Sequence, residues 1–280
     1  MGFYEKLEKL EIPQNRKKFL PRSYSLVGKV LVLRLNKNIL KYKKKIGGAC
    51  LHILPYVHTV VLEKGIEGET RKPKIEILAG CKEHDSTQTI MKEHGCQFLL
   101  DVSKVMWSKG NKSERERMMK STKENESVID MFAGIGYFSI FLAKKAKKVF
   151  AIEINPEAAE YLQKNVWLNS VEGKIEILQG DNRKFASLLE NTADRVVMGY
   201  LKETEKFLPY ALKIAKDKAV IHFHRILKME DIEKEEKKLA GIAKKGKTKI
   251  RILRFVIVKS FAPKVWHVVF DISVEKHRKA

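Results

Sequence analysis

Hydrophobic and polar positions in the first hundred residues predict short strands around one helix. Apolar and polar residues alternate in most of these segments, as they do in half-buried strands. Residues 38–54 start with the spacing of a helix, which Gly47-Gly48 is expected to break. This part of the chain therefore predicts a small α+β domain. The predicted strands are 28–35, 58–65, 74–80 and 97–103.

From Ser127 onward, strand segments alternate with helical segments. Asn155 is suited to cap one helix, and Pro156 to occupy its first position. Repeated βα units predict an α/β fold with a doubly wound, mostly parallel sheet that helices cover on both faces. No helix separates the last two strands, 249–261 and 265–274, so they are expected to form an antiparallel C-terminal hairpin.

The two patterns divide the chain into three predicted parts. Residues 1–105 form the α+β domain, which is expected to contact RNA, and residues 125–280 form the larger domain. Between them, residues 106–124 form a connecting segment with a helix that starts near Glu114, capped by Asn111 or Ser113.

Positive charge dominates the composition. The 280 residues have a formal net charge of +22 and an isoelectric point near 9.7. A charge-rich surface of the thermophilic type explains many charges but not this positive excess. The excess favours a nucleic-acid partner. Candidate phosphate contacts lie in the basic segments 15–22, 41–45 and 69–74, although solvated charge is the alternative.

The cysteines and the hydropathy indicate a cytoplasmic protein. Cys50, Cys81 and Cys96 lack the spacing of a metal site, and three cysteines cannot all pair within one chain, so reduced thiols are expected. No apolar run reaches 18 residues, so no membrane span is expected. Nothing in the sequence implies a metal or an obligate protein partner.

A glycine-containing segment, DMFAGIGYFS at 130–139, lies between a predicted strand and a predicted helix. Gly134 and Gly136 permit a tight turn and the close approach of a ligand, although a turn without a ligand is the alternative. Glu153 ends the next strand, 19 residues after Gly134, where a carboxylate can accept hydrogen bonds from ribose hydroxyls. Ser139 occupies the third glycine position of a dinucleotide motif, which disfavours NAD.

Asp181 and Asn182 follow the third strand of the larger domain. The carboxylate can accept a hydrogen bond from an exocyclic adenine amine, and the amide can pair with a ring nitrogen. A helix N-cap is the alternative for both residues. Together with the glycine loop and Glu153, they predict a nucleoside site at the carboxyl ends of the strands.

Four segments resemble those of class I AdoMet-dependent transferases that modify tRNA next to the anticodon. They are DMFAGIGYFSI, AIEINPEAAEYLQKNVWLN, GDNRKF and GETRKP. One similar branch methylates N1 of guanosine 37. The other, in the wybutosine pathway, transfers the 3-amino-3-carboxypropyl group of AdoMet to C7 of 4-demethylwyosine in tRNA-Phe, and the resemblance to it covers nearly the whole chain.

The resemblance implies that S-adenosyl-L-methionine is the donor substrate. Arg115 is implied to pair with the carboxylate of the methionine moiety, although a solvated helix charge is the alternative. The resemblance implies AdoMet contacts at Ser108, Arg115, Glu153, Asp181 and Asn182. Phe132, Gly134 and Gly136 of the glycine-containing segment are further candidate cofactor-binding residues.

The stretch ADRVVMGYL (193–201) lies where amine methyltransferases carry Asn-Pro-Pro-Tyr or Asp-Pro-Pro-Tyr. Met198 replaces the side chain that accepts a hydrogen bond from the target amine, and both prolines are absent. Met198, Gly199 and Tyr200 are the candidates for the substrate pocket, and Tyr200 could stack on a flipped base. This difference is compatible with attack by a carbon nucleophile.

Three functions follow from these residues: aminocarboxypropyl transfer to tRNA, N1-methylation of guanosine 37, and RNA binding without catalysis. The second is disfavoured by residues 198–200, and the third by the intact cofactor motifs. The sequence identifies no catalytic base. The nearest candidates along the chain are Asp194, Glu203, His222 and His224.

Overall fold

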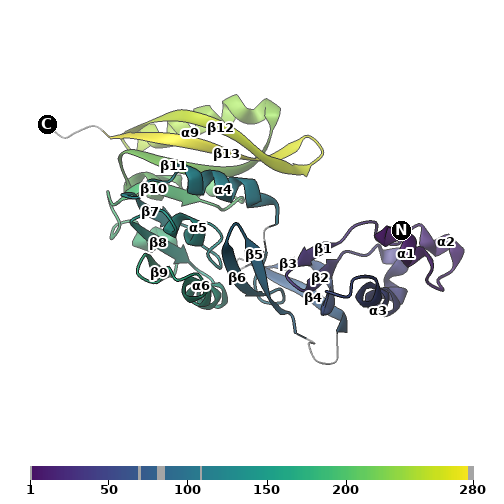
Figure 1. The fold of residues 1–280 in the computed structure, drawn as a ribbon. Coiled ribbons are helices and arrows are strands. Elements are labelled where there is room, and N and C mark those ends of the chain that lie inside the picture. The colour runs from purple at the N-terminus through teal and green to yellow at the C-terminus, as the bar shows by residue number, and fades with distance from the viewer. Residues whose placement is uncertain (1, 69–70, 81–85, 108, 277–280) are drawn as a thin grey trace. The chain divides into compact units, whose positions relative to one another are not determined.

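The structure is a computed structural model that describes residues 2–68, 71–80, 86–107 and 109–276 (Figure 1). It divides into two compact units, Met1–Trp107 and Ser108–Ala280. Of the segment 106–124, which was expected to connect the domains, residues 109–124 belong to the second unit. None of the helices in the described ranges is both long and apolar enough to cross a membrane.

The first unit has the predicted α+β composition. A four-stranded sheet has the order β1-β2-β3-β4, and β5 and β6 form a separate antiparallel hairpin. Strand β2 runs parallel to β3, while the other pairs in the sheet are antiparallel. The strands are β1 (Ser25–Val27), β2 (Val30–Leu33), β3 (Thr59–Glu67), β4 (Lys72–Gly80), β5 (Gln88–Glu93) and β6 (Cys96–Asp101). The helices are α1 (Phe3–Glu8), α2 (Gln14–Lys17), η1 (Lys37–Tyr42) and α3 (Lys43–Ile53).

Helix α3 corrects the expectation that Gly47-Gly48 breaks a helix. The helix passes through both glycines, and Gly47 is buried. A Cβ at Gly47 would lie only 2.6 Å from the Cβ of Leu78 on β4. Glycine at this position therefore lets the helix approach the sheet, and tertiary packing outweighs its low helix propensity.

The second unit contains the doubly wound sheet predicted from the alternating pattern. Its seven strands have the order β12-β13-β11-β10-β7-β8-β9. Neighbours from β11 through β9 are parallel, whereas β13 is antiparallel to both β11 and β12, which confirms the C-terminal hairpin. The strands are β7 (Ser127–Asp130), β8 (Lys148–Glu153), β9 (Ile175–Gln179), β10 (Ala193–Met198), β11 (Ala215–Lys228), β12 (Thr248–Ala262) and β13 (Val265–Lys276).

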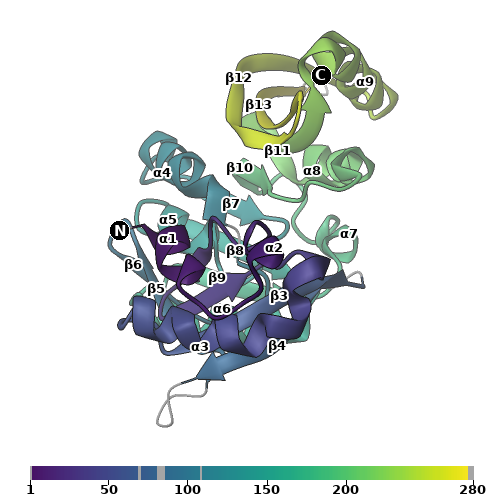
Figure 2. The same ribbon diagram turned by 90° about the vertical axis from the view of Figure 1, so that its right-hand side faces the viewer.

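Helices cover both faces of this sheet. Figure 2 shows α4 and α5 on one face, with α8 and α9 on the other. The cap predicted for α6 is present, because the Asn155 side chain accepts a hydrogen bond from the Glu157 amide and Pro156 is the first helical residue. The helical elements are η2 (Lys109–Asn111), α4 (Lys112–Ser121), α5 (Ser139–Ala143), α6 (Pro156–Leu168), α7 (Asn182–Phe185), η3 (Thr204–Phe207), α8 (Leu208–Ile214), η4 (Met229–Asp231) and α9 (Ile232–Lys245).

The strand order reverses at β7, which is the point where doubly wound sheets bind ligands. The chain leaves β7 toward β8 and β9, and β10 lies on the other side of β7. The loops that follow β7, β8, β9 and β10 therefore meet at one edge of the sheet. These four loops carry most of the residues that the sequence singled out.

Candidate active site

The glycine loop after β7 has the backbone that its sequence predicts. Gly134 and Gly136 have φ angles of 57° and 100°, in the region that favours glycine. A Cβ at Gly136 would lie 2.7 Å from Ile140 and 2.9 Å from Leu162. The loop is therefore pressed onto α5 and α6, and a side chain at Gly136 would displace it.

Buried polar side chains that the sequence analysis did not identify hold this loop. The Ser139 hydroxyl donates to Asp130 over 2.7 Å, and the Asn165 amide donates to the Ile135 carbonyl over 3.0 Å. Burial raises the pKa of Asp130 to about 6 despite the hydrogen bond from Ser139. Ser139, read from the sequence only as a missing glycine, thus anchors the loop.

Glu153 lies at the end of β8 and contacts the loop. Its two carboxylate oxygens accept hydrogen bonds from the backbone amides of Gly134 and Asn155, each over 2.7 Å. Each oxygen can accept a further bond, so the carboxylate remains able to bind two hydroxyls. Burial raises the pKa of Glu153, against the effect of these amides.

Asp181 is the N-cap of α7 and Asn182 is its first residue, and the two differ in whether a side-chain oxygen is open to a ligand. Asp181 caps the helix, and the Arg183 side chain, which pairs with its carboxylate, is the main cause of its lowered pKa. Asn182 is buried and donates to the Met131 carbonyl over 2.9 Å. Its Oδ1 atom is buried without a hydrogen-bond partner among the described residues. An open acceptor here suits the exocyclic amine of adenine. The predicted ring-nitrogen contact would use the second N–H of the amide, whose other N–H is donated to Met131, and it stays a prediction.

The end of β10 separates the three residues expected in the substrate pocket. Met198 is fully buried and belongs to the hydrophobic core, so its side chain is unavailable to a substrate in this structure. This placement follows because β10 is an inner strand, covered on both faces. A Cβ at Gly199 would lie 3.1 Å from the Phe138 ring, so this position has little spare room.

Tyr200 stacks on a residue from the glycine loop. Its ring lies 5.0 Å from that of Phe132 at an interplanar angle of 17°, and Phe207 packs edge-on against both rings. Tyr200 and Phe132 are only half-buried. This aromatic cluster could extend its stack onto a planar base.

Arg115 is buried in the first turn of α4 with 1% of its surface exposed, so it is not a solvated helix charge. Burial raises the pKa of Tyr137, and the positive charge of Arg115 opposes that rise. The charge of Glu153 also acts on Tyr137, and this ring lies against Gly134. Arg115 therefore lies near the glycine loop. Ser108 lies outside the described residues.

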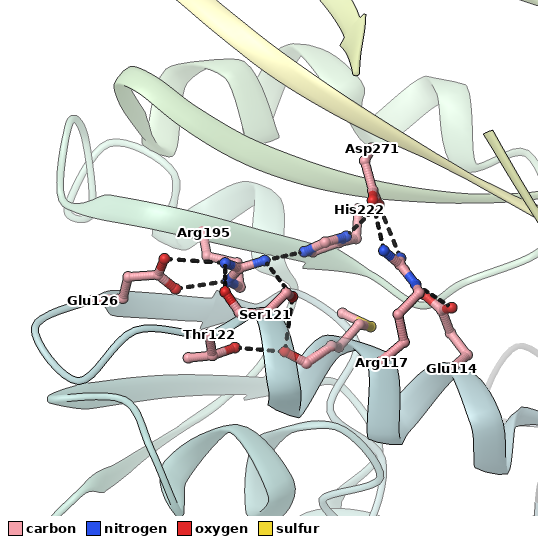
Figure 3. Close-up of polar contacts among 9 residues, drawn as sticks. Glu114, Arg117, Ser121, Thr122, Glu126, Arg195, His222 and Asp271 are labelled. Carbon is pink, nitrogen blue, oxygen red and sulfur yellow. Dashed lines mark hydrogen bonds and ion pairs between the residues drawn. The ribbon is translucent and has the colours of Figure 1, made fainter. Parts of the chain in front are cut away.

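A chain of buried polar contacts holds α4 against the sheet, and no pattern in the sequence predicts it. Figure 3 shows the Arg117 guanidinium between Glu114 and Asp271. Arg117 donates to Asp271 over 2.6 and 2.9 Å and to Glu114 over 2.8 and 2.7 Å. Asp271 lies on β13, so these paired bonds fix the helix directly to the C-terminal hairpin.

The same chain continues across the sheet. His222 on β11 pairs with Asp271 at 2.6 Å and accepts from Arg195 on β10 (Figure 3). Arg195 in turn donates to Glu126 and to the Ser121 carbonyl at the end of α4. Burial lowers the pKa of His222, so the ring is neutral and donates through Nδ1. Burial alone would raise the pKa of Asp271, but hydrogen bonds from His222 and Arg117 hold it well below its usual range.

Two further buried histidines lie beside this chain. His224 on β11 and His267 on β13 share a hydrogen bond of 3.0 Å, and His224 packs edge-on against the Phe138 ring. Burial lowers the pKa of His224 well below its ordinary value and that of His267 to about 4. Both rings are therefore neutral near pH 7.

These positions bear on the candidates for a catalytic base. Asp194 bonds the Ser127 amide and Lys216 at the start of β10, at the edge opposite the glycine loop. Glu203 is exposed and pairs with Lys206. His222 is committed to the polar chain described above, and His224 is fully buried. None of the four is thus placed to reach a bound substrate directly.

We expect His267 to make the second unit sensitive to acid. Folding lowers its pKa from 6.5 to about 4, so between these values the unfolded chain binds a proton that the native chain does not. Stability is therefore lost as the pH falls from 7 toward 4. Between pH 7 and pH 5, the free energy of unfolding of His267→Gln should fall by about 2 kcal/mol less than that of the wild type. Denaturant unfolding at both pH values measures this difference.

The comparison with a variant is needed because Asp130 makes the native state more stable, not less, as the pH falls. Its raised pKa makes the native chain bind a proton below about pH 6, which offsets part of the histidine effect in the wild type. His52→Gln, which removes an exposed histidine, is the control. An unchanged pH dependence in His267→Gln would contradict the assignment of the effect to this ring.

The basic segments of the first unit are partly engaged within it. Lys43 pairs with Glu76 at 2.7 Å, and Lys45 pairs with Glu11 at 3.1 Å. Lys41 lies over the Tyr42 ring and remains exposed. Phosphate contacts at 15–22 and 41–45 stay a prediction, and of the segment 69–74 the first two residues lie outside the described ranges. Within those ranges no cluster of three or more His, Cys, Asp or Glu side chains could hold a metal ion.

Comparison with known proteins places this site in a family. Residues 89–253 match the TRM5/TYW2 methyltransferase domain, and residues 4–85 match the TYW2 N-terminal domain. A protein of Pyrococcus horikoshii, tRNA(Phe) (4-demethylwyosine(37)-C(7)) aminocarboxypropyltransferase, is 40% identical over 268 residues, which are 95% of this chain and 94% of that protein.

One solved structure has a similar fold over nearly the whole chain, and a second relative is named for a different reaction. The crystal structure of P. horikoshii TYW2 in complex with MeSAdo is 37% identical, with a TM-score of 0.84 over 98% of both chains. The tRNA (guanine(37)-N(1))-methyltransferase Trm5b of Pyrococcus abyssi is 35% identical over 269 residues, covering 95% of this chain and 79% of that protein. The chain therefore belongs to the TRM5/TYW2 family.

Proposed function

We propose that this protein transfers the 3-amino-3-carboxypropyl group of AdoMet to C7 of 4-demethylwyosine at position 37 of tRNA-Phe. The observation that carries the proposal is its 40% identity, over 95% of its length, to a relative named for that reaction. The chain is an AdoMet-dependent transferase, and its site has the parts that such a donor requires. Methyl transfer to guanosine 37 is the second candidate, because a Trm5b relative is similar over the same share of the chain.

The site fits the nucleoside part of AdoMet. Glu153 has acceptor capacity at the end of β8, and the buried Oδ1 atom of Asn182 is open. The glycine loop is held by Asp130 and Asn165, so it keeps its shape without a ligand. The residues that bind the donor are therefore preorganised, which lowers the cost of ordering them on binding.

The end of β10 favours carbon chemistry over amine methylation. Met198 points into the core, and Gly199 has no side chain, so neither supplies a side-chain acceptor for a target amine. Tyr200 and Phe132 offer a stacked aromatic surface to a planar base. Holding the base and the donor in line is the main contribution expected from the protein, because the sulfonium is intrinsically reactive.

The reaction balances without a metal or an oxidant. When bound, AdoMet supplies its activated methionine chain: C7 bonds to Cγ, the S–Cγ bond breaks, its electron pair stays on sulfur in methylthioadenosine, and the C7 proton leaves to solvent. The chain's own residues orient the donor so that Cγ, rather than the methyl carbon, faces the base.

The expected partner is tRNA-Phe, and the expected compartment is the cytoplasm. The net charge of +22 supports capture of a polyanion. Cys50 and Cys96 are both buried, which suits thiols that stay reduced in that compartment.

Two samples of AdoMet, labelled in the methyl carbon or in the carboxyl carbon, test the proposed reaction. With tRNA-Phe that carries 4-demethylwyosine, we expect the carboxyl label on the tRNA and an equal amount of released methylthioadenosine. A tRNA-Phe transcript with guanosine at position 37 is the control, and under the proposal it should take up neither label. Methyl label on this transcript with released adenosylhomocysteine would establish the second candidate instead. Tight tRNA binding without any transfer would contradict both reactions.

A further inference from the structure

Strand β12 is an outer edge of the seven-stranded sheet, and all of its charged residues are basic. It pairs with β13 on one side, and no described strand pairs with its other side (Figure 1). It contains no aspartate or glutamate, and its basic residues are Lys249, Arg251, Arg254 and Lys259. Lys259 packs against Gly110, and Lys249 lies opposite Glu275 of β13. The two arginines are exposed, and the proposed function has not used them.

A β-bulge brings these two arginines onto one face of the sheet. Arg251 lies opposite Ser273 of β13. Arg254 lies opposite Asp271, two residues away on the same strand. In a regular strand, residues three positions apart point to opposite faces. The register shift between Ile252 and Arg254 adds one residue and re-aims Arg254. The arginines therefore start from neighbouring rows of one face, about 7 Å apart along the strand.

Neither arginine is paired with an acid of the described residues. Ser273, opposite Arg251, is uncharged. Asp271, opposite Arg254, already holds the Arg117 guanidinium of α4. Two exposed guanidinium groups thus share the α4 face of the sheet without an anion to balance them. A guanidinium offers a planar pair of donors, which matches the oxygens of a phosphate group.

The edge at β12 suits the backbone of a nucleic acid better than another protein strand. Three register shifts interrupt the pairing of β12 with β13, and bulges and basic side chains are features that keep edge strands from pairing with other chains. Tyr200 follows β10, which lies three strands away from β12. That separation is about 14 Å across the sheet, so one RNA molecule can reach both places.

We propose that Arg251 and Arg254 bind backbone phosphates of the tRNA. The inference rests on the proposed function in one respect, since it takes the polyanion to be tRNA, but it does not depend on which group is transferred. Phosphate contacts fix the position of a nucleic acid and carry no sequence information. The arginines would therefore hold the tRNA on the second unit, while the residues at the end of β10 contact the base.

Binding of an unmodified tRNA-Phe transcript to the double variant Arg251→Gln/Arg254→Gln tests this role. Each lost phosphate contact should reduce the steepness of a plot of log affinity against log salt concentration by about 0.7–0.9, so the pair should reduce it by about 1.4–1.8. At about 0.1 M salt the dissociation constant should rise at least about 10-fold. The affinity for AdoMet, measured by calorimetry without tRNA, should stay unchanged.

Two further double variants are the controls. Arg251→Lys/Arg254→Lys keeps both charges, so it should keep the salt dependence and lose only part of the affinity. Lys244→Gln/Lys245→Gln removes the same formal charge from exposed positions at the end of α9, on the opposite face of the sheet (Figure 2). This variant should keep the salt dependence of the wild type. An equal reduction in it would assign the effect to net charge and overturn the proposal.

A second tRNA transcript with a different sequence shows whether the contacts are to phosphates. It should lose the same factor in affinity as tRNA-Phe, and a loss confined to tRNA-Phe would contradict the phosphate contacts. An unchanged salt dependence in Arg251→Gln/Arg254→Gln would overturn the proposal, and the proposed function would stand. If label from the methyl carbon reached the tRNA instead, the proposed function would fail while a reduced salt dependence would still support the two arginines.

Discussion

Replacing Glu153 with alanine should weaken AdoMet binding by at least about 100-fold. A carboxylate that accepts hydrogen bonds from two ribose hydroxyls contributes about 1.5–3 kcal/mol for each bond. The substitution also removes the acceptor for the Gly134 amide, so the glycine loop loses a contact of 2.7 Å. Methylthioadenosine carries the same ribose and should lose a similar factor. Calorimetry with both ligands measures the effect.

The two consequences of this substitution can be separated. Glu153→Gln keeps the size of the side chain and one acceptor oxygen, so it should fall between the wild type and Glu153→Ala. Glu176→Ala on the neighbouring strand β9 removes an exposed carboxylate that pairs with Lys148, and should leave both affinities unchanged. If Glu153→Ala bound AdoMet as tightly as the wild type, Glu153 would have no role at the ribose.

The parts of the site that the sequence predicted depend on local patterns. Gly134 and Gly136 can be predicted from the sequence because a turn between a strand and a helix requires positive φ angles, which favour glycine. Glu153 can be predicted because its spacing from Gly134 along the sequence matches one βα unit. Asn155 can be predicted because its side chain caps the helix that follows it. In each case the physical requirement acts within a few residues or one repeat of the fold, so it leaves a visible spacing.

The remainder depends on residues far apart in the chain. No sequence pattern links Arg117 with Asp271, 154 positions later, because their pairing requires the register of β13 beside α4. Met198 illustrates the opposite error: its place in a motif suggested a pocket, but the burial of β10 turns its side chain into the core. Gly47 fits a helix only because Leu78 packs against it. Such features follow from tertiary contacts, which outweigh local preference.

The contact between α4 and the sheet should contribute strongly to stability through Asp271. Its carboxylate, only 9% exposed as a side chain, pairs with both Arg117 and His222. Asp271→Ala would leave the Arg117 guanidinium and the His222 imidazole without that acceptor in a buried setting. Removing one partner of a buried ion pair typically costs about 3–5 kcal/mol, because the other charge stays desolvated.

We therefore expect Asp271→Ala to lower the free energy of unfolding of the second unit by about 3–5 kcal/mol. Denaturant unfolding in a Trp107→Phe background measures this, since Trp167 and Trp266 then report on that unit alone. Glu176→Ala, which breaks an exposed ion pair, should cost less than about 1 kcal/mol. Folded Asp271→Ala should also bind AdoMet less tightly than the wild type while binding methylthioadenosine normally, because a loosened α4 displaces Arg115 but leaves Glu153 in place. A loss of stability below about 1 kcal/mol would mean that other contacts hold α4, and that Arg117 relies on Glu114 instead.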